Sequence, residues 1–202
     1  MPSKLLFLPG ASGNTQFWLP VANLLTYPAE KVFLKWPGFG STPPDPKVNC
    51  MHDLVDLVIA EIDQPVALIA QSMGCVMAIH ATLQKPEFVT YLVMAVTSGG
   101  MDLESFGAQD WRPLIHAANP SFPRWFSDYD EDLTPEFHKI QALTLLLWGD
   151  ADPISPVSVG QRLASLLPHA KLHIVSGGDH NLAMIHAKAV APLIDEHLTK
   201  VI

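Results

Sequence analysis

Cysteine is scarce in this chain of 202 residues, which has only Cys50 and Cys75. Two cysteines cannot form a disulfide framework, and no spacing of cysteine or histidine matches a metal-binding motif. We therefore expect both to be reduced thiols in the protein core.

Basic residues are also few, since 12 lysines and arginines stand against 20 aspartates and glutamates, for a formal net charge of -8. Without a basic cluster the chain cannot follow a phosphate backbone, so we expect neither nucleic acid nor membrane as a partner. Long hydrophobic runs are absent, and the apolar start that ends at Pro9 is too short for a signal peptide or a membrane span. The expected location is cytoplasmic.

Hydrophobic residues, in contrast, make up 49% of the chain, and charged residues only 16%. This composition is typical of a well-buried globular protein, and 202 residues suffice for one sizeable core. We expect a single domain over residues 1–202, and its oligomeric state cannot be read from the sequence.

Six apolar runs are typical of buried strands, and stretches with helical spacing lie between them. The runs cover residues 5–8, 32–36, 66–70, 92–96, 143–148 and 172–175. Continuous rather than alternating hydrophobicity indicates burial on both faces, as in a parallel sheet covered by helices. The sequence therefore predicts an α/β fold.

Helices are expected between these runs, at residues 15–25, 51–62 and 73–84, after Ser155, and at 187–199. Ser155 is expected to cap its helix, with Pro156 in the first helical position. Pro192 lies inside the last pattern, where proline removes a helical hydrogen bond, so we expect a kink or a later start there.

Residues 98–141 interrupt this alternation with several prolines, an acidic stretch and many aromatic residues. A long segment without a clear period inside a compact domain usually forms a functional loop or a lid. We expect a short lid or cap-like insertion, whose aromatic side chains either line a pocket or form a small core of their own.

The most informative short stretch is AQSMG, residues 70–74, at the junction of a predicted strand and a predicted helix. Small residues two before and two after Ser72 indicate a sharp turn, in which strand and helix pack closely and the serine is exposed. The stretch resembles the nucleophile elbow of the alpha/beta-hydrolase superfamily. A serine that merely caps the helix is the simpler alternative.

Two further loops extend the resemblance in the chain order of that superfamily. Asp152 stands three residues after Gly149, where the family has its acid, and His180 follows the last apolar run in a glycine-rich loop similar to the family's histidine loop. The resemblance implies a triad in which His180 takes the proton of Ser72 and Asp152 holds the imidazole. Asp150 and Asp102 remain alternative acids.

The resemblance also implies an oxyanion hole built from backbone N–H groups. Met73, directly after the serine, supplies the first, and Ala11 supplies the second from a loop in which Pro9 replaces the family's histidine. Five further residues are expected to line the substrate pocket: Gly10, Ser12, Phe39, Trp111 and Trp125.

Taken over nearly the whole chain, the resemblance implies a three-layer alpha/beta-hydrolase fold, with about six parallel strands in the order 2-1-3-4-5-6 and helices on both faces. It implies an esterase-like serine hydrolase that cleaves a small carboxylic ester or thioester through an acyl-enzyme, with no metal or organic cofactor. The same triad could serve carbon–carbon bond hydrolysis, acyl transfer or lyase chemistry, and a non-catalytic, ligand-binding protein of this fold is the other alternative.

Overall fold

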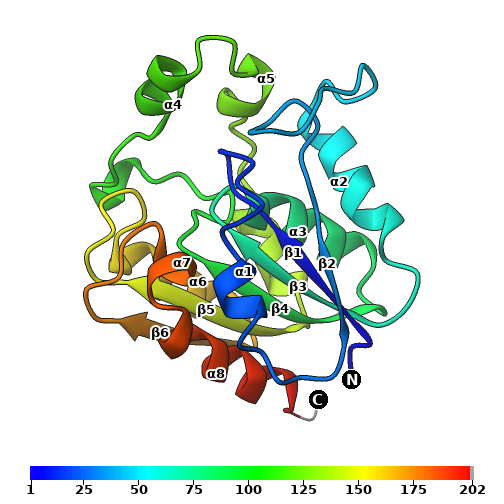
Figure 1. The fold of residues 1–202 in the computed structure, drawn as a ribbon. Helices are drawn as coiled ribbons and strands as arrows, with labels where there is room; N and C mark the ends of the chain where they lie inside the picture. Colours follow the sequence, from blue (N-terminus) through cyan, green and yellow to red (C-terminus); the bar gives the residue numbers. More distant parts are fainter. Residues whose placement is uncertain (201–202) are drawn as a thin grey trace.

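The computed structural model describes residues 1–200, and residues 201–202 lie outside the described part. Six parallel strands form one sheet in the order β2-β1-β3-β4-β5-β6, which confirms the predicted order (Figure 1). The strands are β1 (Lys4–Leu8), β2 (Glu30–Phe33), β3 (Val66–Gln71), β4 (Val89–Ala95), β5 (Leu143–Gly149) and β6 (Ala170–Val175).

Helices cover both faces of the sheet, so the chain has the three layers expected of it (Figure 1). One face carries α2 (Met51–Ala60), α3 (Gly74–Gln84) and α6 (Val157–Leu166), and the other carries α1 (Leu19–Ala22), α7 (Leu182–Ile185) and α8 (Ala187–Leu198). Side chains of β1 alternate between the two cores, with Leu6 and Leu8 in the first and Leu5 and Phe7 in the second.

The central strands and the edge strands differ in burial. Every residue of β1 and β3 is buried, as continuous hydrophobicity predicts, whereas β2 and β6 lie at the edges and are only partly covered. The strand predicted at 32–36 is shifted, because the chain leaves the sheet after Phe33 and places Trp36 in the core instead.

Three helix predictions need correction. The helix expected at 15–25 is the single turn α1, because Pro20 is tolerated only in a first turn. Ser155 does not cap α6, since its hydroxyl donates to the carbonyl of Thr97 and Pro156 takes the capping position. Of the two outcomes expected at Pro192, the later start is wrong, since α8 begins at Ala187 and continues through Pro192, and the kink stays a prediction.

The expectation that both cysteines lie in the core holds for only one of them. Cys75 is buried in α3, whereas Cys50 is exposed just before α2. At that helix start the Asp53 carboxylate accepts hydrogen bonds from the backbone N–H groups of Asn49 and Cys50, so Cys50 is placed by the helix cap.

The segment from 98 to 141 connects β4 to β5 and contains η1 (Glu104–Phe106), α4 (Arg112–Ala118), α5 (Arg124–Ser127) and η2 (Thr134–Lys139). Figure 1 shows α4 and α5 at the top of the view, apart from the sheet. Their attachment is aromatic: the rings of Phe122 and Phe126 are buried against each other and against Phe39. Within residues 1–200, every helix is too short or too polar to span a bilayer.

A buried histidine lies where α8 crosses the sheet. His197 is only 2% exposed and donates from Nε2 to the carbonyl of Leu143 at 3.1 Å, while its Nδ1 has no hydrogen-bond partner among residues 1–200. Burial, and secondarily the positive charge of Lys200, lower the pKa of His197 from its ordinary 6.5 to about 4.

Acid should therefore destabilise the fold through this residue. The unfolded chain binds a proton at His197 near pH 6.5 and the folded chain does not, so this contribution is complete above that pH and is lost as the pH falls toward 4. Between pH 7.5 and 4.5 the free energy of unfolding, measured with denaturant, should fall in both proteins. The fall should be smaller in His197→Gln than in the native protein by roughly 2–3 kcal/mol. The exposed His138→Gln serves as control, and equal losses in the native protein and His197→Gln would contradict this account.

Candidate functional site

Ser72 sits at a strained turn between the end of β3 and the start of α3. Its φ is 52°, in the left-handed region that L-residues other than glycine avoid. Two hydrogen bonds fix this conformation: the Ser72 N–H donates to the carbonyl of Ala95 at 2.9 Å, and the Thr97 hydroxyl donates to the carbonyl of Ser72 at 2.7 Å. The turn therefore depends on the end of the neighbouring strand β4.

Close packing explains the small residue two positions after the serine. A Cβ atom on Gly74 would lie 2.4 Å from the carbonyl oxygen of Pro9, in the loop that follows β1. Because that neighbour is backbone, it cannot move aside as a flexible side chain would. Glycine at this position lets the loop after β1 approach the turn that carries Ser72.

The loop after β1 is anchored by two buried indoles. Trp36 donates from Nε1 to the carbonyl of Pro9 at 2.9 Å, and Trp18 donates from Nε1 to the carbonyl of Leu8 at 3.2 Å. Pro9 itself offers no side-chain hydrogen bond, so these indoles hold the backbone. Among residues 1–200, neither the N–H of Ala11 nor that of Met73 donates a hydrogen bond.

The structure brings Ser72, His180 and Asp152 together in one hydrogen-bonded chain. His180 Nε2 lies 3.0 Å from the Ser72 hydroxyl oxygen, and His180 Nδ1 lies 2.8 Å from Oδ2 of Asp152. A carboxylate only accepts, so Nδ1 carries the proton and Nε2 is left to accept from the hydroxyl. The arrangement can remove a proton from Ser72 and hold the resulting imidazolium.

The carboxylate of Asp152 is fully enclosed, while the imidazole keeps 22% of its surface accessible. Oδ1 accepts hydrogen bonds from the backbone N–H groups of Ile154 and Ser155, at 2.8 and 3.1 Å. Both oxygens of this buried acid therefore have donors, as a buried charge requires.

The two alternative acids lie elsewhere. Asp150 accepts from the N–H of Gly177 at 2.6 Å and so ties the acid loop to the histidine loop. Gly149 meets the same loop so closely that a Cβ there would lie 2.0 Å from the carbonyl oxygen of Gly178. Asp102 is exposed and accepts from the N–H of Glu104, and the imidazole of His180 pairs with Asp152 instead.

Thr97 was not singled out from the sequence, yet it joins two parts of the site. Its hydroxyl donates to Ser72 and accepts from the N–H of Gly99, and its carbonyl accepts from the hydroxyl of Ser155 in the acid loop. A pair of hydroxyl residues just beyond β4, Thr97 and Ser98, was the available signal, because that position lies at the carboxyl edge of the sheet.

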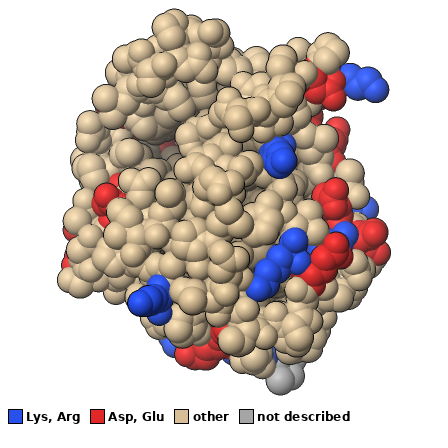
Figure 2. All heavy atoms as spheres, viewed as in Figure 1, with Lys and Arg blue, Asp and Glu red and all other residues tan. Residues whose placement is uncertain are grey.

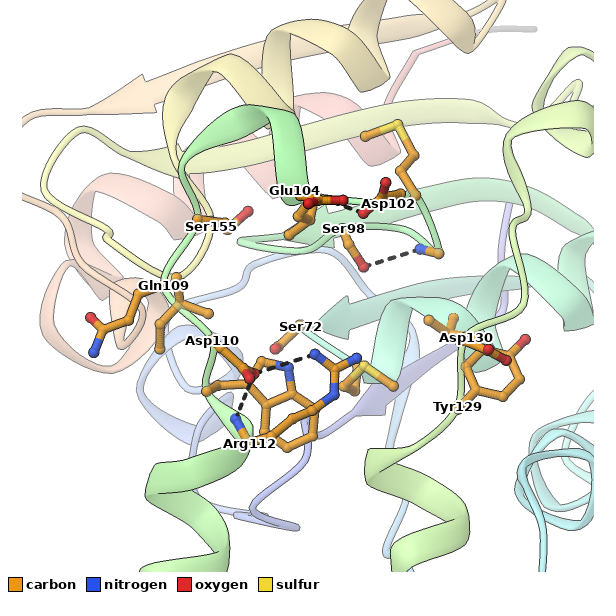
Figure 3. Close-up of a pocket in the computed structure, with 18 of the residues that line it drawn as sticks. Ser72, Ser98, Asp102, Glu104, Gln109, Asp110, Arg112, Tyr129, Asp130 and Ser155 are labelled. Atoms are coloured by element: carbon orange, nitrogen blue, oxygen red, sulfur yellow. Dashed lines mark hydrogen bonds and ion pairs between the residues drawn. The ribbon is translucent and has the colours of Figure 1, made fainter.

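A cavity of about 460 Å³ opens onto Ser72, Met73 and His180. Its other walls come from the end of β4, the acid loop and the segment 98–141, and Figure 3 shows its labelled residues around Ser72. The volume lies in the range of small-molecule sites. The cavity is also lined by acidic residues, of which the sequence suggested a site role only for Asp102, as an alternative acid.

Of the five side chains expected to line the pocket, Trp111 lines this cavity and four lie elsewhere. Phe39 is buried and Trp125 packs against its ring at 5.9 Å between ring centres, so both belong to the aromatic cluster that holds the segment 98–141. Gly10 is buried beneath Ser72, and Ser12 accepts a hydrogen bond from the N–H of Asn14.

Cys75, the second residue of α3, offers no second nucleophile. Its thiol is completely buried, and burial raises its pKa to about 12, so the thiolate is disfavoured. Among residues 1–200, no group of three or more His, Cys, Asp or Glu side chains is placed to hold a metal ion.

The sequence matches two known protein families. The sequence profile described as the alpha/beta hydrolase family matches residues 5–139, and that of a TAP-like protein matches residues 124–201. A poly(3-hydroxyalkanoate) depolymerase of Ectopseudomonas oleovorans is 46% identical over 61 residues, which are 30% of this chain and 21% of the depolymerase. The matched segments span only 21% to 26% of the length of four such curated relatives.

Solved structures resemble the fold over nearly the whole chain. A thermophilic esterase from Thermogutta terrifontis superposes with a TM-score of 0.78 at 16% identity, covering 96% of this chain and 89% of the esterase. A 2-hydroxy-6-oxo-6-phenylhexa-2,4-dienoate hydrolase from Rhodococcus sp. strain RHA1 gives 0.79 at 15% identity, covering 98% and 91%. At such identities the likeness shows the fold alone.

The strained backbone at Ser72 predicts that a glycine variant is more stable than an alanine variant. Ser72→Ala keeps a Cβ in the left-handed region, whereas Ser72→Gly adopts that region freely. Both lose the hydroxyl, so thermal or denaturant unfolding should find the glycine variant more stable than the alanine variant by about 1 kcal/mol. If the alanine variant proves equally or more stable, the turn is not strained in solution.

Proposed function

Because the chain belongs to the alpha/beta hydrolase family, we propose that it is a serine hydrolase that cleaves a carboxylic ester or thioester of a small substrate. The observation that carries the proposal is the hydrogen-bonded chain from Ser72 through His180 to Asp152, which opens into a cavity of about 460 Å³. A hydroxyl, an imidazole and a carboxylate in this order make a nucleophile out of an ordinary serine.

In the acylation step the Ser72 oxygen attacks the carbonyl carbon while His180 Nε2 takes the hydroxyl proton. Asp152, bonded to Nδ1, stabilises the imidazolium that forms. The imidazolium then gives its proton to the leaving alkoxide or thiolate, and the acyl group stays on Ser72. Water, deprotonated by His180, attacks the acyl-enzyme and releases the acid, and the proton returns to Ser72.

The N–H groups of Met73 and Ala11 are proposed to bind the oxyanion. Met73 immediately precedes α3, and Ala11 belongs to the loop that approaches Gly74. Their lack of partners among residues 1–200 leaves both available, and the indole of Trp36 fixes the backbone just before Ala11. Donors held in place beforehand need no rearrangement when charge develops on the carbonyl oxygen.

We further propose that residues 98–141 form a short lid over the site. The segment supplies much of the cavity wall, and the N–H of Gln109 donates to the carbonyl of Pro153 at 2.7 Å, which joins the segment to the acid loop. The aromatic cluster around Phe39 and Phe122 holds its other side. Both alternatives left open for its aromatic residues thus find support: Trp111 in the wall and Phe122 in a small core.

Carbon–carbon bond hydrolysis is the second candidate, because the Rhodococcus dienoate hydrolase shares the fold over 98% of this chain. The same serine, histidine and aspartate can serve either reaction, so identification of the reaction products is needed to tell which bond is cleaved. An ester gives an acid and an alcohol, whereas a carbon–carbon substrate gives an acid and a carbon fragment.

Active-site labelling tests the nucleophile. A fluorophosphonate probe should label the native protein on Ser72, located by peptide mass spectrometry, because the activated hydroxyl attacks phosphorus as it attacks a carbonyl. Ser72→Ala should not be labelled, and Cys75→Ala should be labelled like the native protein. An unlabelled native protein would refute the proposal.

Turnover of nitrophenyl esters of increasing acyl length tests the roles of the other two residues. His180→Ala and Asp152→Asn should each lower kcat on the order of 10⁴-fold, since the base is lost in one and its orientation in the other. Asp150→Asn is the matched control, and it should keep most of the activity because Asp150 bonds a loop N–H instead. A larger loss in Asp150→Asn than in Asp152→Asn would reassign the acid.

A further inference from the structure

The wall of the cavity that reaches Ser72 is strongly negative. Six carboxylates lie on it against one guanidinium, and the chain has 20 acidic residues in all. The six belong to Asp102, Glu104, Asp110, Asp130, Glu131 and Asp132. Three of them are consecutive in the acidic stretch at 130–132, and the fold of the segment 98–141 brings Asp102, Glu104 and Asp110 to the same opening.

Little positive charge compensates them. The guanidinium of Arg112 pairs with Asp110 at 3.3 Å, and its Nε donates to the carbonyl of Ser127. Oε2 of Glu131 lies 3.6 Å from Nε2 of His80 and accepts a hydrogen bond from the hydroxyl of Tyr129. The other four carboxylates have no Lys, Arg or His nitrogen within 4.0 Å among residues 1–200; they are those of Asp102, Glu104, Asp130 and Asp132.

These acids stand on different sides of the nucleophile. Figure 3 shows Asp102 beside Glu104 on one side of Ser72, Asp110 with Arg112 on another, and Asp130 next to Tyr129 on a third. In Figure 2 the Lys and Arg side chains of the face in view lie away from α4 and α5. A charged substrate entering here meets six carboxylates and one guanidinium.

Aromatic faces accompany the carboxylates. Trp111 and Tyr129 both line the cavity, and the guanidinium carbon of Arg112 already lies 5.6 Å from the centre of the Trp111 ring. Aromatic rings attract cations through their faces, and they attract quaternary ammonium groups in particular. Carboxylates and rings together favour a cation over an uncharged group of the same shape.

We infer that this hydrolase selects esters that carry an ammonium group and discriminates against anionic esters. The inference rests on the proposed function and names the charge of its substrate. It concerns the specificity of the cavity at Ser72, not a separate site. It also disfavours a carboxylate substrate such as the dienoate of the Rhodococcus hydrolase, because that anion would meet six like charges.

Three nitrophenyl esters, whose acyl chains have three methylene groups before the end group, test this charge selectivity. Their acyl groups are 4-(trimethylammonio)butyrate, the uncharged 5,5-dimethylhexanoate and the anionic glutarate. At low ionic strength kcat/KM should fall in that order, by about tenfold at each step, because several exposed charges at a few ångströms act in concert. Added salt at about 0.5 M should shrink both ratios, since exposed charges are screened.

A triple variant locates the cause. Asp102→Asn, Glu104→Gln and Asp130→Asn together remove three unpaired charges, and the ratio of cationic to uncharged ester should fall at least threefold. The matched control is Asp45→Asn, Asp56→Asn and Glu87→Gln, which makes the same change in net charge at exposed positions outside the cavity. Its ratio should equal that of the native protein.

The outcomes separate the two proposals. Hydrolysis of all three esters with a ratio near one, or a ratio equally lowered by the control, overturns the charge selection and leaves the serine hydrolase standing. No hydrolysis of any ester, together with an unlabelled Ser72, overturns the proposed function and this inference with it.

Discussion

The hydrogen bond between His180 and Ser72 joins residues 108 positions apart in the chain, and the candidate site depends on it. A contact of 3.0 Å tolerates little error, so the loops after β3 and β6 must be fixed to within a fraction of an ångström. The parallel sheet provides this, because strands in register bring their carboxyl ends to one edge. Packing on both faces then makes that edge rigid.

Backbone contacts between loops complete what the strands begin. Because Gly74 has no Cβ, the carbonyl of Pro9 can pack against it, and Gly149 contacts the carbonyl of Gly178 in the same way. Each of these loops therefore packs against the backbone of another. Thr97 joins the serine turn to the acid loop, since its hydroxyl donates to the carbonyl of Ser72 and its backbone carbonyl accepts from the hydroxyl of Ser155. Such contacts explain how a residue in the left-handed region persists at Ser72: its surroundings determine its conformation more strongly than its own preference does.

The sequence predicted what depends on local pattern. Buried central strands, α2 and α3 follow from hydrophobic spacing, and the candidates Ser72, Asp152 and His180 follow from the resemblance of three loops to those of the alpha/beta-hydrolase superfamily. Their roles stay predictions. Edge strand β2 was misplaced because a run of apolar residues does not reveal where a chain leaves a sheet, and Trp36 leaves it to anchor the loop after β1. The surroundings of Phe39 could not be predicted either, since only tertiary contact separates a pocket wall from an aromatic core, and its ring packs against Phe122 and Phe126.

The acidic wall illustrates a different limit of sequence reading. Asp102 and Asp130 are exposed and lie apart in the chain, and the sequence suggested Asp102 only as an alternative acid and Asp130 only as part of an acidic stretch. Only the path of the segment 98–141 brings them to one opening. The proposed triad depends on hydrogen bonds of about 3 Å, which require exact placement, whereas charges around a cavity act over roughly a Debye length of 8–10 Å. The acids therefore need no exact placement, and a loosely patterned segment can set specificity on a site whose chemistry demands a rigid sheet.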